Sequence, residues 1–206
     1  MNIADKDVYE YMINFADDKT ILNMLSVNRK FRDEEFFERI MIRRYPLLIE
    51  FRKEGETWKH LFIRMVHILA TLQETYQLPY IATKGCNPER LLKSKDIYKD
   101  AAACAAAGDH VEILKYLIEK KGVKIFDSTE LTKAAKHGSF KVMDYLLKFH
   151  RHPLDLEYAV GSAIFWSNLP SLKFLQKKGH ILTSVDLEYA EQVSNQEVID
   201  YIKQFV

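Results

Sequence analysis

A chain of 206 residues with 48% hydrophobic and 29% charged side chains has the composition of a folded globular protein and not of a disordered one. Its 30 basic and 29 acidic side chains nearly cancel, which argues against a nucleic-acid-binding protein, because that class usually carries a strong basic excess. Cys86 and Cys104 form no paired motif, which favours a reducing compartment with both thiols free. We see neither a signal peptide nor a membrane-spanning segment, so we expect a cytoplasmic protein with no membrane partner.

Residues 1–50 predict a small set of helices. The segments DVYEYMINF and KTILNMLSVNRKF carry apolar side chains at helical spacing, and Asp17 and Asp18 between them predict a break and an N-cap. These apolar side chains are Val8, Met12, Phe15, Ile21, Leu22 and Leu25. In DEEFFERIMIRRYP, acidic residues open the expected helix, Arg43 and Arg44 close it, and Pro46 stops it.

Residues 51–95 predict one long helix followed by a linker. The segment TWKHLFIRMVHILATLQETY carries a single apolar stripe, so we expect a core helix that supports the rest of the chain. The stripe consists of Trp58, Leu61, Phe62, Met65, Leu69, Leu72 and Tyr76. The segment LPYIATKGCNPERLLKSK contains two prolines and a glycine and is the expected linker.

Residues 96–206 contain an internal repeat of about four copies. The copies are marked by the aromatic residues Tyr116, Tyr145, Phe174 and Tyr201, which follow one another at intervals of 29, 29 and 27 residues. Each copy predicts a helix rich in small residues, a break, and a second helix with apolar residues at helical spacing. A pair of helices this short cannot bury its apolar face alone, so the copies should stack.

The breaks between the paired helices are expected at Asp109, Gly138, Ser167 and Ser194. A residue that ends a helix is often left-handed, a conformation that glycine accepts freely and aspartate tolerates. Because Asp109 is already non-glycine, we expect it to accept Gly or Asn with little change. The SNQE segment, residues 194–197, predicts a capping box. The motif DLEYA occurs twice, and its greater distance from the break in the third copy predicts one extra helical turn there.

The copies resemble ankyrin repeats. The core pattern of that family, AAxxGHxxVVxxLL, is matched in the second copy by Ala134, Ala135, Gly138, Val142, Met143, Leu146 and Leu147. No copy carries the TPLH turn of the family, and the period is shorter than its ~33 residues, so we expect shortened or absent β-hairpin fingers. The resemblance implies a helical solenoid with a groove that binds a protein.

The first half resembles an F-box in the order of its signals, INFADDKTILNMLSVNRKF followed by FFERIMIRRYP. This resemblance implies that Met12, Phe15, Leu22 and Leu25 of an F-box-like head recruit a host Skp-type adaptor and cullin of a ubiquitin ligase. The stretches RRYPLLIEFRKEGETWKHLFIRM and GCNPERLL, together with the copies, resemble the ankyrin-repeat proteins of giant amoeba-infecting viruses. For such a protein the compartment would be the cytoplasm of the host cell.

Catalytic and metal chemistry find little support in the sequence. His150 and His152 could chelate a metal, but no cysteine or carboxylate stands at ligand spacing beside them, and zinc needs three or four ligands. Cys104 lies in an alanine run without a base partner, and no phosphate-binding loop is present. We therefore expect no catalytic residue, no metal and no cofactor.

A partner-binding surface is the remaining kind of site. Lys133, Lys136 and His137 surround the alanine pair of the second copy, and Phe165 and Trp166 precede the break of the third. The two aromatic residues can pack inside the third copy or anchor a partner in the groove. A target that meets both groups would be an acidic peptide with one bulky apolar residue.

The sequence thus predicts an all-α protein with an F-box-like helical module at 1–50, a connecting helix and linker at 51–95, and ankyrin-like repeats at 96–206. We expect a non-catalytic protein-protein interaction protein. The alternatives are a scaffold or decoy whose head only caps the solenoid and, disfavoured by the balanced charge, a nucleic-acid-associated viral protein.

Overall fold

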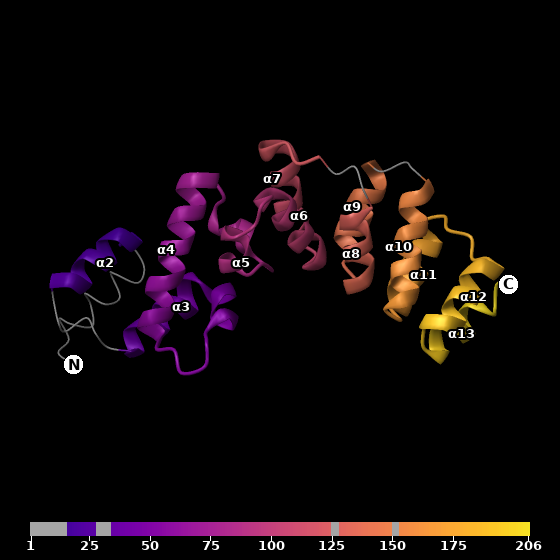
Figure 1. Cartoon of the computed structure of the whole chain (residues 1–206), viewed down its shortest axis with the longest axis horizontal. Helices are drawn as coiled ribbons and strands as arrows, with labels where there is room; N and C mark the ends of the chain where they lie inside the picture. The colour runs from indigo at the N-terminus through magenta and orange to yellow at the C-terminus, as the bar shows by residue number, and fades with distance from the viewer. Residues whose placement is uncertain (1–15, 28–33, 125–127, 150–152) are drawn as a thin grey trace. The chain divides into compact units, whose positions relative to one another are not determined.

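The computed structural model describes residues 16–27, 34–124, 128–149 and 153–206, and these are helical, with turns and loops between helices and no strand among them (Figure 1). The all-α fold class expected from the sequence is confirmed. The described residues form two compact units, the first extending to Tyr80 with the addition of Asn87–Leu92, and the second comprising Ile81–Cys86 and Lys93–Val206. Within the described residues, no helix is both long and apolar enough to cross a membrane.

The first unit is built on two helices that the sequence patterns predicted. Its elements are α2 (Asp18–Val27), α3 (Glu34–Arg44), the 3-10 helix η2 (Pro46–Phe51), α4 (Trp58–Tyr76) and α5 (Pro88–Leu92). Helix α3 opens with two glutamates and ends with two arginines, as predicted, and the chain turns at Pro46. Helix α4 begins after Thr57, whose hydroxyl accepts a hydrogen bond from the backbone N–H of His60 at 3.2 Å.

The core of the first unit lies between α3 and α4, which pack against each other. Its fully buried aromatic rings include Phe37 and Phe62, whose centroids are 5.6 Å apart. The start of α2 joins this core through Asp18, which accepts a hydrogen bond from Tyr45 and pairs with Arg44 at 3.1 Å. The N-cap predicted before α2 is confirmed, because Asp17 Oδ1 accepts a hydrogen bond from the Thr20 N–H at 2.7 Å.

The second unit is a stack of four helix pairs, which Figure 1 shows following one another in chain order. The pairs are α6 (Ile97–Ala107) with α7 (Val111–Lys121), α8 (Thr129–His137) with α9 (Phe140–Phe149), α10 (Pro153–Phe165) with α11 (Leu169–Lys177), and α12 (Ser184–Val193) with α13 (Gln196–Ile202). A short 3-10 helix, η3 (Tyr80–Thr83), begins at the end of the first unit and enters the second. The first helices form one row, in which α8 packs against both α6 and α10, and α10 against α12.

Small side chains allow the helices of this row to approach one another closely. Ala134 and Ala135 of α8 and Ala163 of α10 are fully buried, whereas the second helices bury larger side chains such as Leu146 and Leu172. Helix α10 has 13 residues against 10 in α12, which confirms the extra turn predicted for the third copy.

All four breaks lie where the periodicity placed them, but they differ in conformation. Asp109, Gly138 and Ser167 are left-handed, with φ of 59°, 72° and 52°. Ser194 is extended, with a φ of −106°. The capping box predicted at residues 194–197 is wrong: the N-cap of α13 is Asn195, whose side chain accepts a hydrogen bond from the Val198 N–H at 3.1 Å.

Hydrogen bonds connect each break to the break of the preceding pair. Ser139 donates to the carbonyl of Ala107 at 2.9 Å, Asn168 donates to the carbonyl of Lys136 at 3.0 Å, and the backbone N–H of Asn195 donates to Ser167 Oγ at 3.0 Å. The first two bonds satisfy carbonyl groups at helix ends that have no partner within their own helix, and the third is accepted by a serine hydroxyl. They also fix the spacing between consecutive pairs.

The start of helix α9 is capped by the preceding repeat. Its own N-cap position holds Ser139, whose hydroxyl is directed to Ala107. The third N–H of the helix, that of Val142, instead donates to Asp109 Oδ1 at 3.0 Å. Asp109 therefore both turns its own helix pair and caps the next one.

Candidate protein-binding groove

A groove opens across the exposed side of α8, α10 and α12, with a volume of about 650 Å³. Its lining consists of Ser128, Thr129, Thr132, Lys133, Glu157, Tyr158, Gly161, Ser162, Phe165 and Tyr189. The first helices bury their alanines on one side, so the residues on the opposite side are left to solvent. The repeat itself thus produces the groove.

Helical spacing places the aromatic side chains of the groove together. Tyr158, Gly161 and Phe165 follow one another at steps of three and four along α10 and therefore share one face of that helix. Tyr189 reaches the same groove from α12. Tyr158 and Phe165 remain 60% and 49% exposed and share the groove with Tyr189, and such a cluster of exposed apolar side chains is typical of an interaction surface.

Gly161 lines the groove near the Tyr189 ring and contributes no side chain there. A Cβ atom added at this position would lie 4.0 Å from Cε1 of Tyr189. A side chain larger than a methyl group would therefore extend into the space between the helices. The absence of a side chain keeps the groove open beside the Tyr189 ring.

The two sides of the groove carry opposite charges. Lys133 is exposed on the α8 side and Glu157 is exposed on the α10 side. Neither side chain forms an ion pair with another residue in the described part of the chain. Both are available for a charged group of a ligand.

Lys136 and Trp166 contact each other beside the groove. The Lys136 ammonium lies 3.4 Å from the centroid of the Trp166 ring, in cation–π contact. The Phe165 and Trp166 rings pack edge to face with centroids 5.3 Å apart. The contact between Lys136 and Trp166 joins α8 to the end of α10. Trp166 remains 52% exposed.

The structure divides the five residues that the sequence proposed for the groove. Lys133 and Phe165 line it, and Lys136 and Trp166 form the cation–π pair next to it. His137 is exposed but is not among the lining residues. Desolvation of part of its ring, together with the positive charges of Lys136 and Lys133, lowers the pKa of His137, which favours its neutral form.

Sequence reasoning missed the tyrosines of the groove. Tyr158 and Tyr189 are the fourth residues of the two DLEYA motifs, so a signal for them was present. The two tyrosines differ by four residues in their distance from the following break, which is about one helical turn and leaves both on the same helix face.

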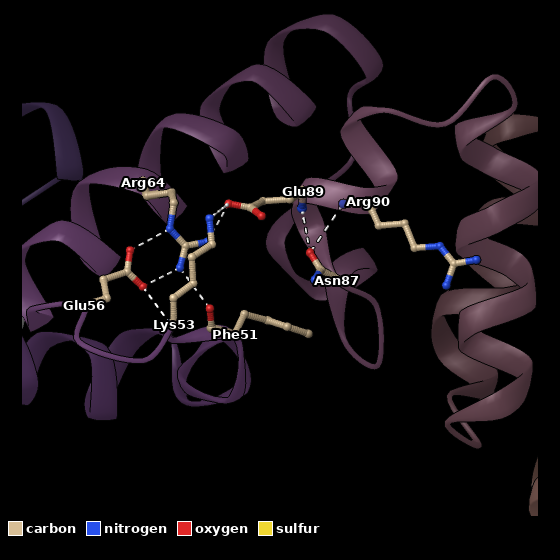
Figure 2. A network of polar contacts seen from close by, with 7 residues as sticks. All are labelled: Phe51, Lys53, Glu56, Arg64, Asn87, Glu89 and Arg90. Carbon is tan, nitrogen blue, oxygen red and sulfur yellow. Dashed lines mark hydrogen bonds and ion pairs between the residues drawn. The ribbon is translucent and has the colours of Figure 1, made fainter.

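The first unit contains a polar network around Arg64, shown in Figure 2. Arg64 donates to both carboxylate oxygens of Glu56, at 2.7 and 2.6 Å, to Glu89 at 2.6 Å, and to the carbonyl of Phe51 at 2.9 Å. The hydrogen bonds from Arg64 hold the pKa of Glu56 below its usual value. Lys53 adds a backbone hydrogen bond to Glu56 at 3.0 Å and an ion pair with Glu89 at 3.4 Å.

This network is structural, because its charged groups satisfy one another. It connects the loop before α4, the first half of α4, and α5. Asn87 completes it by accepting hydrogen bonds from the backbone N–H groups of Glu89 and Arg90 at 3.0 and 3.4 Å. The residues come from the two stretches, RRYPLLIEFRKEGETWKHLFIRM and GCNPERLL, on which the viral resemblance rests.

The partner-binding residues predicted in the head are only partly described. Met12 and Phe15 lie outside the described residues. Leu25 belongs to α2, but its side chain is likewise outside them. Leu22 is half-buried and packs against the core of the first unit. His150 and His152, considered for a metal, are also outside the described residues, and the residues that are described bring no three metal-ligating side chains together.

Comparison with known families identifies the repeats. Residues 102–147 match the family model for ankyrin repeats (many copies), a segment that runs from α6 into α9 and contains the breaks at Asp109 and Gly138. No curated protein and no solved structure matches the chain significantly. The matched segment supports an ankyrin-repeat protein, and such repeats generally mediate protein–protein interaction.

Proposed function

We propose that the protein is a non-catalytic binding module that holds a protein segment in the groove of its first helices. The observation that carries the proposal is the row of exposed aromatic side chains, Tyr158, Phe165 and Tyr189, in the two helix pairs that follow the matched segment, residues 102–147. Large aromatic residues in a concave surface are the usual anchors of protein interfaces. The groove is wide open to solvent, so an extended chain segment can enter it.

The ligand that fits this groove is a peptide segment with a bulky apolar residue and a neighbouring carboxylate. The apolar residue would lie over Gly161, between the rings of α10 and α12. The carboxylate would lie on the α8 side, where Lys133 has no acidic partner within the described structure. Glu157 on the opposite side would repel the same carboxylate and so sets the direction of the peptide.

The proposal is tested by selecting binders from a displayed random peptide library with the full chain. We expect the selected peptides to share an acidic and a bulky apolar position. Phe165→Ala should weaken their binding by about 2 kcal/mol, as expected of an anchor. The matched control is Phe205→Ala, because Phe205 is 51% exposed but lies outside the groove lining.

The charge of the ligand is tested separately. Lys133→Glu should weaken binding of a selected acidic peptide, and replacing the acid of that peptide by lysine should restore it. Lys120→Glu, on an exposed position of α7, is the control for net charge. Loss of binding in both control variants, or peptides whose binding survives Phe165→Ala, would refute the groove as the site.

Recruitment of a host Skp-type adaptor and cullin by the head is a second candidate function, carried only by the F-box resemblance. The half-burial of Leu22 against the head core favours a role in folding over a role in binding. Leu22→Asp should then unfold the first unit. A purified Skp-type adaptor that binds the wild type, and fails to bind a folded Leu22→Asp variant, would reverse this preference.

A further inference from the structure

The two cysteines of the chain are brought together within the second unit. They are 18 residues apart in the sequence, with Cys86 after the turn at Gly85 and Cys104 in α6. The two thiols are near enough for Cys104 to be the first cause of a raised pKa at Cys86. The backbones are also close, because a Cβ atom added at Gly85 would lie 3.6 Å from the carbonyl oxygen of Cys104.

The two thiols differ in their access to solvent. Cys86 is 1% exposed, whereas Cys104 is only partly buried. The neighbouring Cys104 side chain, together with burial, raises the pKa of the Cys86 thiol and makes it a poor first nucleophile. Cys104 is therefore the thiol that an external reagent reaches.

We propose that Cys86 and Cys104 are a site of reversible disulfide formation, driven by a small-molecule disulfide of the glutathione class. In the first step the Cys104 thiolate attacks one sulfur of the reagent, its S–S bond breaks, and one glutathione thiolate leaves. In the second step the Cys86 sulfur, losing its proton to solvent, attacks Cys104 and releases the second glutathione. The protein loses two hydrogen atoms and two electrons, and the reagent becomes two thiols.

The position of this bond gives it a consequence for the fold. Residues Ile81–Cys86 and the chain from Lys93 onward belong to the second unit, whereas Asn87–Leu92 belong to the first. A bond between Cys86 and Cys104 closes a loop that contains all of Asn87–Leu92, the segment that belongs to the first unit. Closing a loop removes conformations from the unfolded chain, so the oxidised protein should melt at a higher temperature than the reduced one.

The test is to incubate the folded full chain with oxidised glutathione and to measure its mass and free thiols. We expect an intramolecular disulfide, the loss of two hydrogens, no free thiol, and full reversal by dithiothreitol. Cys86→Ala should stop at a mixed disulfide between glutathione and Cys104. Cys104→Ala, a small change within an alanine run, should leave the buried Cys86 unmodified.

The outcomes separate the proposal from its alternatives. A wild-type chain that keeps both thiols free, that stops at the mixed disulfide, or that forms a disulfide-linked dimer would overturn it. Modification of Cys86 in the Cys104→Ala variant would overturn the order of attack. Circular dichroism of each reduced variant confirms that the measurement was made on folded protein.

Discussion

Replacing Asp109 tests whether one repeat caps the next. Asp109 has a left-handed φ of 59°, and its carboxylate accepts a hydrogen bond from the Val142 N–H at 3.0 Å. Asn keeps both an acceptor and a tolerance of this backbone conformation. Gly accepts the conformation but has no acceptor, and Ala has neither property. The three substitutions thus separate the two roles of the residue.

The expected losses follow from these two roles. A capping hydrogen bond contributes ~1 kcal/mol, and a left-handed alanine costs ~1 kcal/mol or more. Asp109→Ala should therefore destabilise the second unit by ~2–3 kcal/mol, Asp109→Gly by ~1 kcal/mol or less, and Asp109→Asn by ~0.5 kcal/mol. The prediction made from the sequence, that Asp109 accepts Gly or Asn with little change, did not include this hydrogen bond.

Urea unfolding followed by circular dichroism measures these free energies of unfolding. Hydrogen exchange adds a local readout, because the Val142 amide should exchange faster in the Gly and Ala variants than in the Asn variant. If Asp109→Gly is as stable as Asp109→Asn and the Val142 amide is equally protected in both, the cap between repeats contributes nothing.

Three further predictions concern other parts of the molecule. Gly138→Val should destabilise the second unit by ~1–2 kcal/mol in urea unfolding, because its φ of 72° disfavours a β-branched residue; an unchanged midpoint would contradict this. Hydrogen bonds from Arg64 lower the pKa of Glu56 in the folded protein. The ionised Glu56 therefore stabilises the fold above the ordinary glutamate pKa. This stabilisation is lost as the pH falls through the lower pKa of the folded state. Acid melts should show a smaller decrease for Glu56→Gln, and identical decreases would exclude Glu56 as the cause. Phe62→Ala should cost the first unit ~3–5 kcal/mol by calorimetry, since the ring is fully buried; a loss below ~1 kcal/mol would mean that the core collapses around the cavity.

The order and limits of the helices follow closely from local signals. Alternation of a small-residue helix, a break and an apolar helix predicted all four pairs, because a helix end depends on residues within a few positions of it. Helix α3 could be predicted for the same reason, since acids open it, arginines close it and Pro46 follows. The error at residues 194–197 was also local: two adjacent residues, Ser194 and Asn195, could each serve as the cap.

Contacts between repeats could not be read from the sequence. Asp109 looked like a plain turn residue because its partner, Val142, lies 33 positions further along the chain. Trp166 could equally have been buried or exposed, and the distinction depended on Lys136, which belongs to the preceding pair. The groove raised the same difficulty, since the exposure of Tyr158 and Tyr189 is set by how closely the first helices pack.

The physical reason is the range of the interactions. Helix propensity, capping and apolar periodicity act over a few residues, so the sequence alone determined that this chain forms stacked helix pairs. The placement of Cys86 beside Cys104, the cap from Asp109, and the aromatic row of the groove each join residues from different elements. Such contacts depend on the distance and rotation between packed helices, and only the tertiary structure decided them.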